Sequence, residues 1–146
     1  MTYDLERFKD AQNWDYPTAL AEICAGRKQS HWIWYILPQL KGLGHSAMCA
    51  RYGIADMGEA EAYLADQTLR ERLVEISQAL LALDTDDPVE VMGGIDALKL
   101  RSCMTLFSRA RNTDPIFEAV LDKYYNGKPD QRTLELLEDS RVASQP

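Results

Sequence analysis

Apolar residues along positions 69–83 recur at alternating steps of four and three, which places them on one face of a helix. Asp66 lies just before this stripe, where its carboxylate can accept a hydrogen bond from a free backbone N–H and so cap the helix. An Ala- and Glu-rich stretch from Met57 to Leu64 favours a further helix upstream. The pattern therefore predicts two consecutive helices. The apolar face of the second consists of Leu69, Leu73, Ile76, Leu80 and Leu83.

The first fifty residues contain signals for three shorter helices. Leu5 and Phe8, three positions apart, give a short apolar stripe. Pro17 fits the first position of a second helix, where the missing N–H loses no hydrogen bond, and Gly26 can end that helix. Ser46 can cap a third. We therefore expect a helix boundary at Pro17.

The C-terminal half is also predicted to be helical. Pro88 opens a short helix that stops at Gly93, and Asp96 can cap a longer helix that runs to about Arg111, with Asn112 as its C-terminal cap. Two more helices are predicted, from Asp114-Pro115 to Asn126-Gly127 and around Leu134 and Leu137.

The segment from Ser30 to Leu40 does not show a clear helical or strand period. It is dense in aromatic and β-branched residues, which suits a short strand, but Pro38 interrupts it. One or two buried helical turns ending before Pro38 fit equally well. Periodicity does not decide between the two for so short an apolar run.

These elements predict an all-α fold, a single compact domain of about seven short helices. The chain has 146 residues, a common size for one domain, and 46% hydrophobic residues are enough for a core. No repeat, linker or low-complexity tract divides it. We expect the domain to cover residues 1–137 and residues 138–146 to form a frayed C-terminal tail.

Charge and hydropathy exclude several kinds of partner. A net charge of −7 disfavours binding to a nucleic-acid backbone, which requires clustered Lys and Arg. No apolar run approaches the roughly 20 residues of a membrane span, and the first residues do not form a signal peptide. We therefore expect a cytoplasmic protein without membrane contact. The oligomeric state is left open.

The three cysteines, Cys24, Cys49 and Cys103, do not have the spacing of a zinc site. We expect reduced thiols, no metal and no resident cofactor. The alternative is that one of the three thiols acts as a nucleophile. Its pKa would then have to be lowered, and no residue nearby in the sequence would lower it.

A candidate ligand site lies in the aromatic segment. His31, Trp32 and Trp34 fall within four residues, and Gln39 follows them. Flat aromatic walls with a few polar groups are typical of small-molecule pockets. The alternative is a core segment whose indole N–H groups find backbone partners.

A second candidate lies at the helix predicted to start at Asp96. The start of a helix attracts anions, and Lys99, Arg101 and Ser102 would add positive charge and a hydroxyl for a phosphate group. The alternative is an ordinary amphipathic helix with solvated basic residues. Gly42-Leu43-Gly44, which resembles half of a phosphate-binding loop, is interpreted as a turn.

The sequence does not identify catalytic residues. Carboxylates are plentiful, but no pair is placed by its spacing in an acid–base geometry. Asp96, or a Glu near it, and His31 are the candidates for acid–base groups.

Several motifs along the chain are typical of one family: Gly26-x-Lys28-x-Ser30-His31-Trp32-x-Trp34, Pro38-Gln39-Leu40, Gly42-Leu43-Gly44, Tyr52-Gly53-Ile54, Glu59-Ala60-x-x-Tyr63-Leu64, Asp96-x-x-Lys99-Leu100-Arg101-Ser102-x-Met104-Thr105-Leu106-Phe107 and Thr133-Leu134-x-Leu136-Leu137. By these motifs the chain resembles an uncharacterised bacterial family, domain of unknown function 1810, whose members are often labelled calpastatin. The resemblance spans roughly Leu5 to Leu137. A calpain inhibitor of that name is long, repeated and largely disordered, whereas this chain is short and apolar enough to fold, so calpain inhibition is not expected.

The helix from Lys99 to Phe107 also looks distantly similar to the NADAR superfamily, whose members are helical and cleave N-glycosidic bonds of ADP-ribose derivatives. That family's acidic and Trp-Gly signature is not evident in this chain, so no catalytic residue is carried over.

Two functional hypotheses follow. In the first, the chain is a domain that binds a nucleotide or ADP-ribose-like molecule, or an N-glycosidase-type hydrolase of such a molecule. The residues His31, Trp32, Trp34 and Gln39 would form one half of a pocket, and Lys99, Arg101 and Ser102 would form the other. In the second, it is a non-enzymatic protein-interaction module. The first hypothesis requires the two segments to meet in space.

Overall fold

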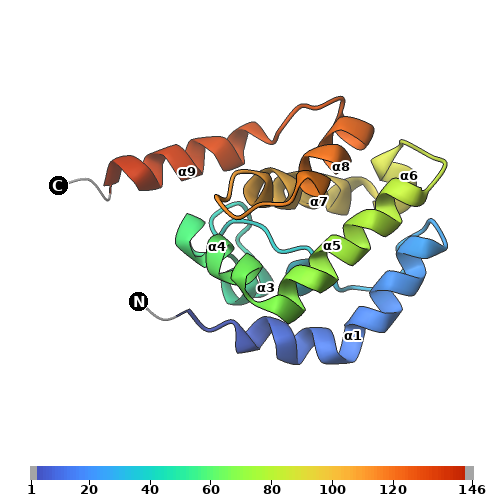
Figure 1. Cartoon of the computed structure of the whole chain (residues 1–146), viewed down its shortest axis with the longest axis horizontal. Helices are drawn as coiled ribbons and strands as arrows, with labels where there is room; N and C mark the ends of the chain where they lie inside the picture. Colours follow the sequence, from blue (N-terminus) through green and yellow to red (C-terminus); the bar gives the residue numbers. More distant parts are fainter. Residues whose placement is uncertain (1–2, 144–146) are drawn as a thin grey trace.

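The computed structural model describes residues 3–143, with side chains through Asp139. Figure 1 shows helices joined by short loops, and no strand occurs in this described part. The predicted all-α class is confirmed. There are nine helices between residues 3 and 143 rather than about seven, and three of them have only four to six residues. Their bounds are α1 Glu6–Cys24, α2 Ile33–Ile36, α3 Ala47–Tyr52, α4 Met57–Ala65, α5 Gln67–Ala82, α6 Pro88–Met92, α7 Gly94–Ser108, α8 Pro115–Tyr125 and α9 Gln131–Ala143.

Helix α5 occupies the middle of the molecule, packed against α1 on one side and α8 on the other (Figure 1). Helix α7 packs against α6, α8 and α9. A chain of aromatic rings runs through the core between these helices: Phe8 meets Tyr63 edge-on at 5.2 Å between ring centroids, Tyr63 meets Phe107 at 5.1 Å, and Phe107 meets Phe117 at 6.0 Å. Such pairs stabilise the fold beyond the area they bury.

Most predicted helix ends are confirmed. The side chain of Asp66 accepts a hydrogen bond from Leu69 N–H at 3.1 Å, and Ser46 accepts one from Cys49 N–H at 3.1 Å. Asp114 caps α8, which ends at Asn126 in the left-handed conformation. These ends were predictable because the capping side chain and the backbone group that it satisfies are only two or three residues apart.

The helix boundary predicted at Pro17 is wrong. Helix α1 is continuous from Glu6 to Cys24 and includes Pro17. Its buried residues form one unbroken stripe, whereas Pro17 is exposed, so the backbone carbonyl that loses its partner can be hydrated. Burial of the stripe outweighs the roughly 3 kcal/mol that an internal proline costs a helix. The stripe consists of Phe8, Gln12, Tyr16, Ala19 and Ile23.

The helix cap predicted at Asp96 is also wrong. Helix α7 begins at Gly94, and Gly93 precedes it with a positive φ of 86° and no capping side chain. Helix α7 ends at Ser108, so Asn112 lies beyond it, where its side-chain amide donates to the Glu61 carbonyl at 2.9 Å. Asp96 is in the first turn and has a different partner, described below.

The segment from Ser30 to Leu40 contains one helical turn, α2, that ends before Pro38. After the proline the backbone extends and forms a single parallel bridge between Leu40 and Ile54. Ile54 N–H donates to the Gln39 carbonyl at 2.9 Å, and Lys41 N–H donates to the Ile54 carbonyl at 2.8 Å. The aromatic part of the segment, before Pro38, is therefore helical, which is one of the two alternatives that the sequence left open.

At the C-terminal end, helix α9 extends to Ala143, past residue 138 where a frayed tail was expected to begin. Residues 144–146 of that expected tail lie outside the described residues.

Within the described part, no helix is long and apolar enough to cross a membrane.

Candidate functional site

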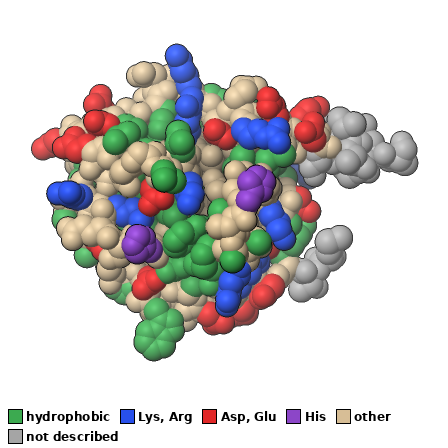
Figure 2. Space-filling model, turned by 180° about the vertical axis from the view of Figure 1, so that it is seen from behind, with side chains coloured by type: hydrophobic (Ala, Val, Ile, Leu, Met, Phe, Trp, Pro, Cys, Tyr) green, Lys and Arg blue, Asp and Glu red, His purple; other side chains and the backbone are tan. Residues whose placement is uncertain are grey.

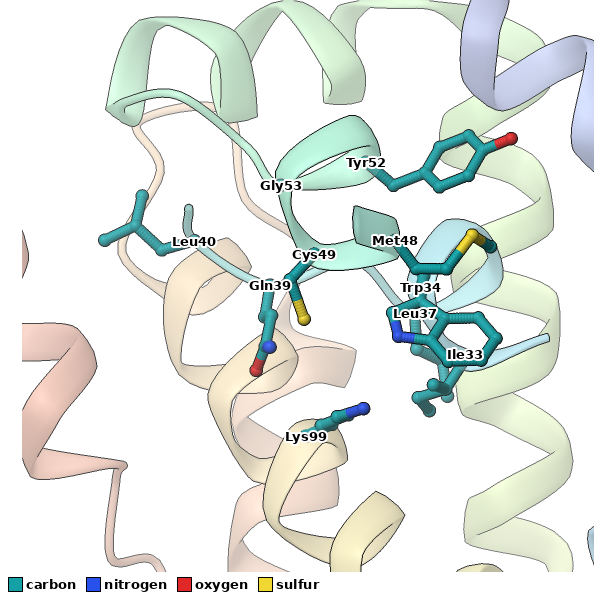
Figure 3. Close-up of a pocket in the computed structure, with 10 residues that line it drawn as sticks. All are labelled: Ile33, Trp34, Leu37, Gln39, Leu40, Met48, Cys49, Tyr52, Gly53 and Lys99. Atoms are coloured by element: carbon teal, nitrogen blue, oxygen red, sulfur yellow. The ribbon is translucent and has the colours of Figure 1, made fainter. Parts of the chain in front are cut away.

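Two adjoining hollows lie between the loop after α2 and one side of α7. The smaller, which we call the tip pocket, has a volume of about 10 Å³ (Figure 3). The larger, which we call the outer groove, has a volume of about 290 Å³. Gln39 and Lys99 line both. The tip pocket is lined by Ile33, Trp34, Leu37, Gln39, Leu40, Met48, Cys49, Tyr52, Gly53 and Lys99. The outer groove is lined by Gln39, Leu43, Gly44, Ile95, Leu98, Lys99, Ser102, Asp130 and Arg132.

Trp34 supplies one wall of the tip pocket from helix α2. Its side chain is half-buried, yet its indole Nε1 is fully buried and has no hydrogen-bond partner. Figure 3 shows the indole nitrogen at the side of the ring that faces Cys49 and Gln39. A buried donor without a partner is rare in folded proteins because its desolvation is not compensated.

Lys99 faces this wall from helix α7. Its ammonium lies 5.2 Å from the centroid of the Trp34 ring, which is cation–π distance. In the part of the chain that the structure describes, no carboxylate lies within ion-pair distance of it. The site therefore combines an uncompensated positive charge with an unpaired donor.

Trp32 has a structural position, although it is two residues from Trp34. It is 1% exposed, and its Nε1 donates to a carboxylate oxygen of Glu22 at 2.9 Å. The same carboxylate accepts hydrogen bonds from Gln29 N–H at 2.8 Å, Ser30 N–H at 2.9 Å and the Ser30 hydroxyl at 2.5 Å. Glu22 thus holds the loop after α1, and with it the start of the segment that presents Trp34.

The pKa of Glu22 reflects this arrangement. Burial alone would raise it, but the hydrogen bonds from Ser30, Gln29 and Trp32 stabilise the charged carboxylate more strongly and lower the pKa to about 2. Each of these donors would lose a charged acceptor if the carboxylate were protonated.

Glu22 should therefore make the unfolding free energy depend on pH. Its folded pKa lies below the unfolded value of 4.5, so its contribution is complete above pH 4.5 and is lost as the pH falls toward 2. We expect the difference in unfolding free energy between the natural chain and Glu22→Gln to shrink by about 1–2 kcal/mol between pH 6 and pH 3, allowing for solvent screening. Urea denaturation at the two pH values measures this. A difference independent of pH would contradict the assignment.

Lys28 and Asp96 connect the same loop to helix α7. The Lys28 ammonium lies 2.8 Å from an Asp96 carboxylate oxygen and 4.8 Å from the centroid of the Trp32 ring, and it donates to the Ser30 carbonyl. The Lys28 side chain is only 6% exposed. This pair fixes the loop before Trp34 to the first turn of the helix that carries Lys99.

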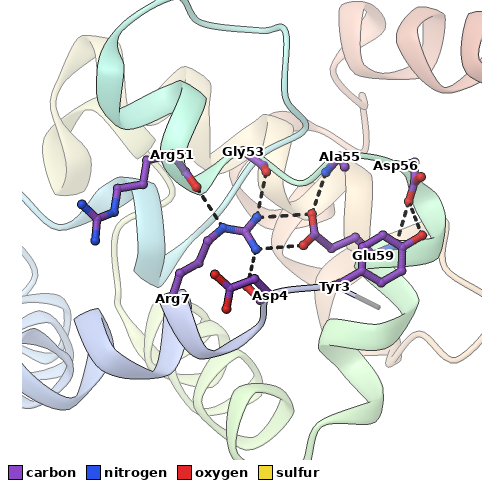
Figure 4. Close-up of polar contacts among 8 residues, drawn as sticks. All are labelled: Tyr3, Asp4, Arg7, Arg51, Gly53, Ala55, Asp56 and Glu59. Carbon is purple, nitrogen blue, oxygen red and sulfur yellow. Dashed lines mark hydrogen bonds and ion pairs between the residues drawn. The ribbon is translucent and has the colours of Figure 1, made fainter. Parts of the chain in front are cut away.

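A second cluster of polar contacts holds the segment that contributes Gly53 to the tip pocket (Figure 4). Arg7 forms a bidentate ion pair with Glu59, at 2.9 and 3.3 Å. Its guanidinium also donates to the Gly53 carbonyl at 3.0 Å and to the Arg51 carbonyl at 2.9 Å. Glu59 in turn accepts from Ala55 N–H at 2.7 Å. Helix α1 therefore anchors the 51–55 segment, which includes the pocket residue Gly53.

The structure brings four of the predicted binding residues together: Trp34, Gln39, Lys99 and Ser102 line the tip pocket or the outer groove. The two candidate segments of the sequence therefore meet. Ser102 has its hydroxyl bonded to the Leu98 carbonyl at 3.1 Å. Sequence reasoning missed Arg132 and Asp130, which enter the groove from the start of α9 and have no motif of their own.

The other predicted binding residues lie elsewhere. Trp32 is in the core, and His31 is exposed. Arg101 donates to the Lys128 carbonyl at 2.9 Å and stacks 5.5 Å from the centroid of the Tyr125 ring. In Figure 2 the face that carries both histidines also shows hydrophobic side chains gathered between them.

Neither candidate acid–base residue lines the two hollows. The Asp96 carboxylate is engaged by Lys28, and His31 is a surface residue. Among the described residues, no group of His, Cys, Asp and Glu could hold a metal ion. The cysteines are free thiols: Cys24 is exposed, Cys49 is half-buried, and burial raises the pKa of Cys103.

Comparison with known families identifies the chain. Residues 2–137 match the model of a protein family of unknown function, DUF1810. The chain belongs to the DUF1810 family. Among solved structures it is similar to a conserved hypothetical protein, Rv1873 from Mycobacterium tuberculosis, with 44% sequence identity and a TM-score of 0.91 over 93% of this chain and 97% of that one.

These comparisons do not assign an activity to DUF1810. No curated protein matches the chain, and neither the family nor the solved structure shows a similarity to the NADAR superfamily. The motifs by which the chain resembles DUF1810 fall into two physical groups. Lys28, Ser30 and Trp32 make internal contacts, whereas Trp34, Gln39 and Lys99 line the tip pocket.

Proposed function

We propose that this DUF1810 protein binds a small molecule, a nucleotide or ADP-ribose derivative, in the outer groove and tip pocket. The observation that carries the proposal is the convergence of Trp34 and Gln39 with Lys99 and Ser102, from segments about sixty residues apart, around two adjoining hollows. Core packing does not require an uncompensated lysine beside an unpaired indole N–H. The expected cytoplasmic location, which rests on the sequence, suits such ligands.

The composition of the outer groove supports this class of ligand. Lys99 and Arg132 supply positive charge for a phosphate group. Leu43, Ile95 and Leu98 supply apolar surface for a ring. A volume of about 290 Å³ is near the lower end of the range for small-molecule sites.

The proposal is one of binding rather than hydrolysis. The carboxylate that lines the groove is Asp130, and its Oδ2 already accepts hydrogen bonds from Thr133 N–H at 2.9 Å and from the Thr133 hydroxyl at 2.6 Å. It acts as the cap of α9. An N-glycosidase would need an acid–base group free to reach the scissile bond.

A protein-interaction module is the second candidate, and one observation favours it. Ile95 and Leu98 are 73% and 64% exposed on the same side of α7. Exposed apolar side chains at a groove also suit a protein partner. Under this hypothesis, small ligands would not stabilise the chain.

Thermal unfolding with AMP, ADP-ribose and NAD separates the two candidates. A ligand at a hundredfold excess over its Kd stabilises the native state by about 2.7 kcal/mol. We expect stabilisation by at least one of these compounds, lost in Lys99→Met and retained in Arg101→Met, whose side chain turns away from the groove. Absence of stabilisation with all three compounds, or equal loss in both variants, would refute the proposal.

A further inference from the structure

The polar groups at the closed end of the site are nearly all donors. An indole N–H and an ammonium group donate hydrogen bonds and cannot accept them. Trp34 Nε1 has no partner, and no described carboxylate lies within ion-pair distance of Lys99. Asp130 lines the outer groove with Lys99, but its carboxylate is hydrogen-bonded to Thr133. In the described part of the chain, the Lys99 ammonium therefore lies, without an ion pair, beside a buried donor that has no acceptor.

Gln39 adds a third group that can donate. Its backbone carbonyl accepts from Ile54 N–H, but its side-chain amide has no hydrogen bond with the described residues. Figure 3 shows this amide and the Lys99 side chain on the same side of the pocket. Three side chains, from α2, the following loop and α7, therefore surround one small space, and none of them has a hydrogen bond to the described residues.

The volume of that space limits what can enter it. About 10 Å³ is room for approximately one water-sized group. The bulk of a ligand must therefore remain in the outer groove, and only one end group can enter.

We infer that the tip pocket receives an anionic oxygen of the bound ligand, from a carboxylate or a phosphoryl group, between Trp34 Nε1 and the Lys99 ammonium. The apolar part of that ligand lies outside, on Ile95 and Leu98. This inference rests on the proposed function and narrows it: the ligand is an organic anion bound by its charged end. The oxygen supplies the acceptor that the indole N–H lacks and the counter-charge that Lys99 lacks.

Matched pairs of probes that differ in the charged group test the inference by calorimetric titration at constant ionic strength. AMP against adenosine tests a phosphoryl group, and benzoate against benzyl alcohol tests a carboxylate. We expect the anionic member of at least one pair to bind at least tenfold more tightly than its neutral partner. The pair that shows this preference identifies the source of the oxygen.

Variants of the chain separate the pocket from general charge attraction. Lys99→Met should abolish the preference for the anion, whereas Arg101→Met, an equal loss of charge on the same helix, should retain it. Trp34→Phe should weaken the anion about tenfold without lowering the unfolding temperature, because it removes an unpaired buried donor and keeps an aromatic ring.

The outcomes distinguish the inference from the proposed function. If adenosine and benzyl alcohol bind as tightly as AMP and benzoate, the inference is wrong while the groove remains a binding site. If Trp34→Phe lowers the unfolding temperature and leaves the preference for the anion intact, Trp34 is a packing residue and the inference is also wrong. If none of the four probes binds and the nucleotide screen is negative as well, the proposed function fails, and with it the inference.

Discussion

Arg7→Met is expected to lower the free energy of unfolding by about 3–5 kcal/mol, the largest single effect that the structure predicts. The Glu59 side chain is 3% exposed and the Arg7 side chain 16%. Removing the guanidinium leaves the buried Glu59 carboxylate with one hydrogen-bond donor, the backbone N–H of Ala55. It also leaves the carbonyls of Arg51 and Gly53 without the guanidinium as a donor. Chemical denaturation measures the loss.

Arg111→Met is the matched control. Arg111 also pairs with a glutamate, Glu61, at 3.8 Å, but its side chain is 94% exposed. An exposed ion pair of this kind contributes less than about 1 kcal/mol. The double variant Arg7→Met/Glu59→Met should recover part of the stability because it removes the unpaired buried carboxylate, while the Arg51 and Gly53 carbonyls still lack their donor. Equal losses in Arg7→Met and Arg111→Met would show that the buried pair does not anchor α1.

Asp96→Asn is expected to lower the free energy of unfolding by about 2–3 kcal/mol while leaving ligand affinity within threefold of that of the natural chain. The asparagine leaves the Lys28 ammonium, 6% exposed, without its counter-charge. Asp96 does not line the tip pocket or the outer groove, so its effect on binding is indirect. Denaturation and titration of the same preparation measure both quantities.

Glu118→Gln controls for the position of Asp96 near a helix start. Glu118 is likewise an acidic residue in a first turn, that of α8, but it is exposed. It should lose only the interaction with the helix dipole, less than about 1 kcal/mol. If Asp96→Asn abolished binding with little change in stability, Asp96 would be a site residue, as the sequence suggested, and not a partner of Lys28.

The parts of the fold that were predictable depend on short-range physics. The apolar stripe of α5 and the caps at Asp66 and Asp114 are each set by residues within one helical turn. The helix boundary at Pro17 was predicted wrongly because burial of α1 along its whole length outweighs the local preference of proline for the first position of a helix. Asp96 was misassigned because a side chain that can cap a helix can also bind a lysine that is distant in sequence.

The same difference between local and distant interactions decides which parts of the candidate site were predictable. The sequence selected the two segments that meet. Trp34 was selected by an unusual local composition, and Lys99 by its place among basic residues at a predicted helix start. It did not distinguish Trp34 from Trp32, because the carboxylate that satisfies Trp32 belongs to Glu22, ten residues earlier on another element. The Arg7–Glu59 pair, 52 residues apart, has no local signal at all.

The most direct test of the account follows the three indole N–H signals in a proton–nitrogen correlation spectrum during titration with the ligand that stabilises the chain. Tryptophan occurs three times, and the three indoles differ in environment: Trp14 is 86% exposed, Trp32 donates to Glu22, and Trp34 has no acceptor. Trp34→Phe assigns the third signal by its absence. The account predicts that the Trp34 signal shifts downfield on binding, as its N–H gains an acceptor, while those of Trp14 and Trp32 stay in place. Saturable binding that leaves the Trp34 signal unmoved would contradict it.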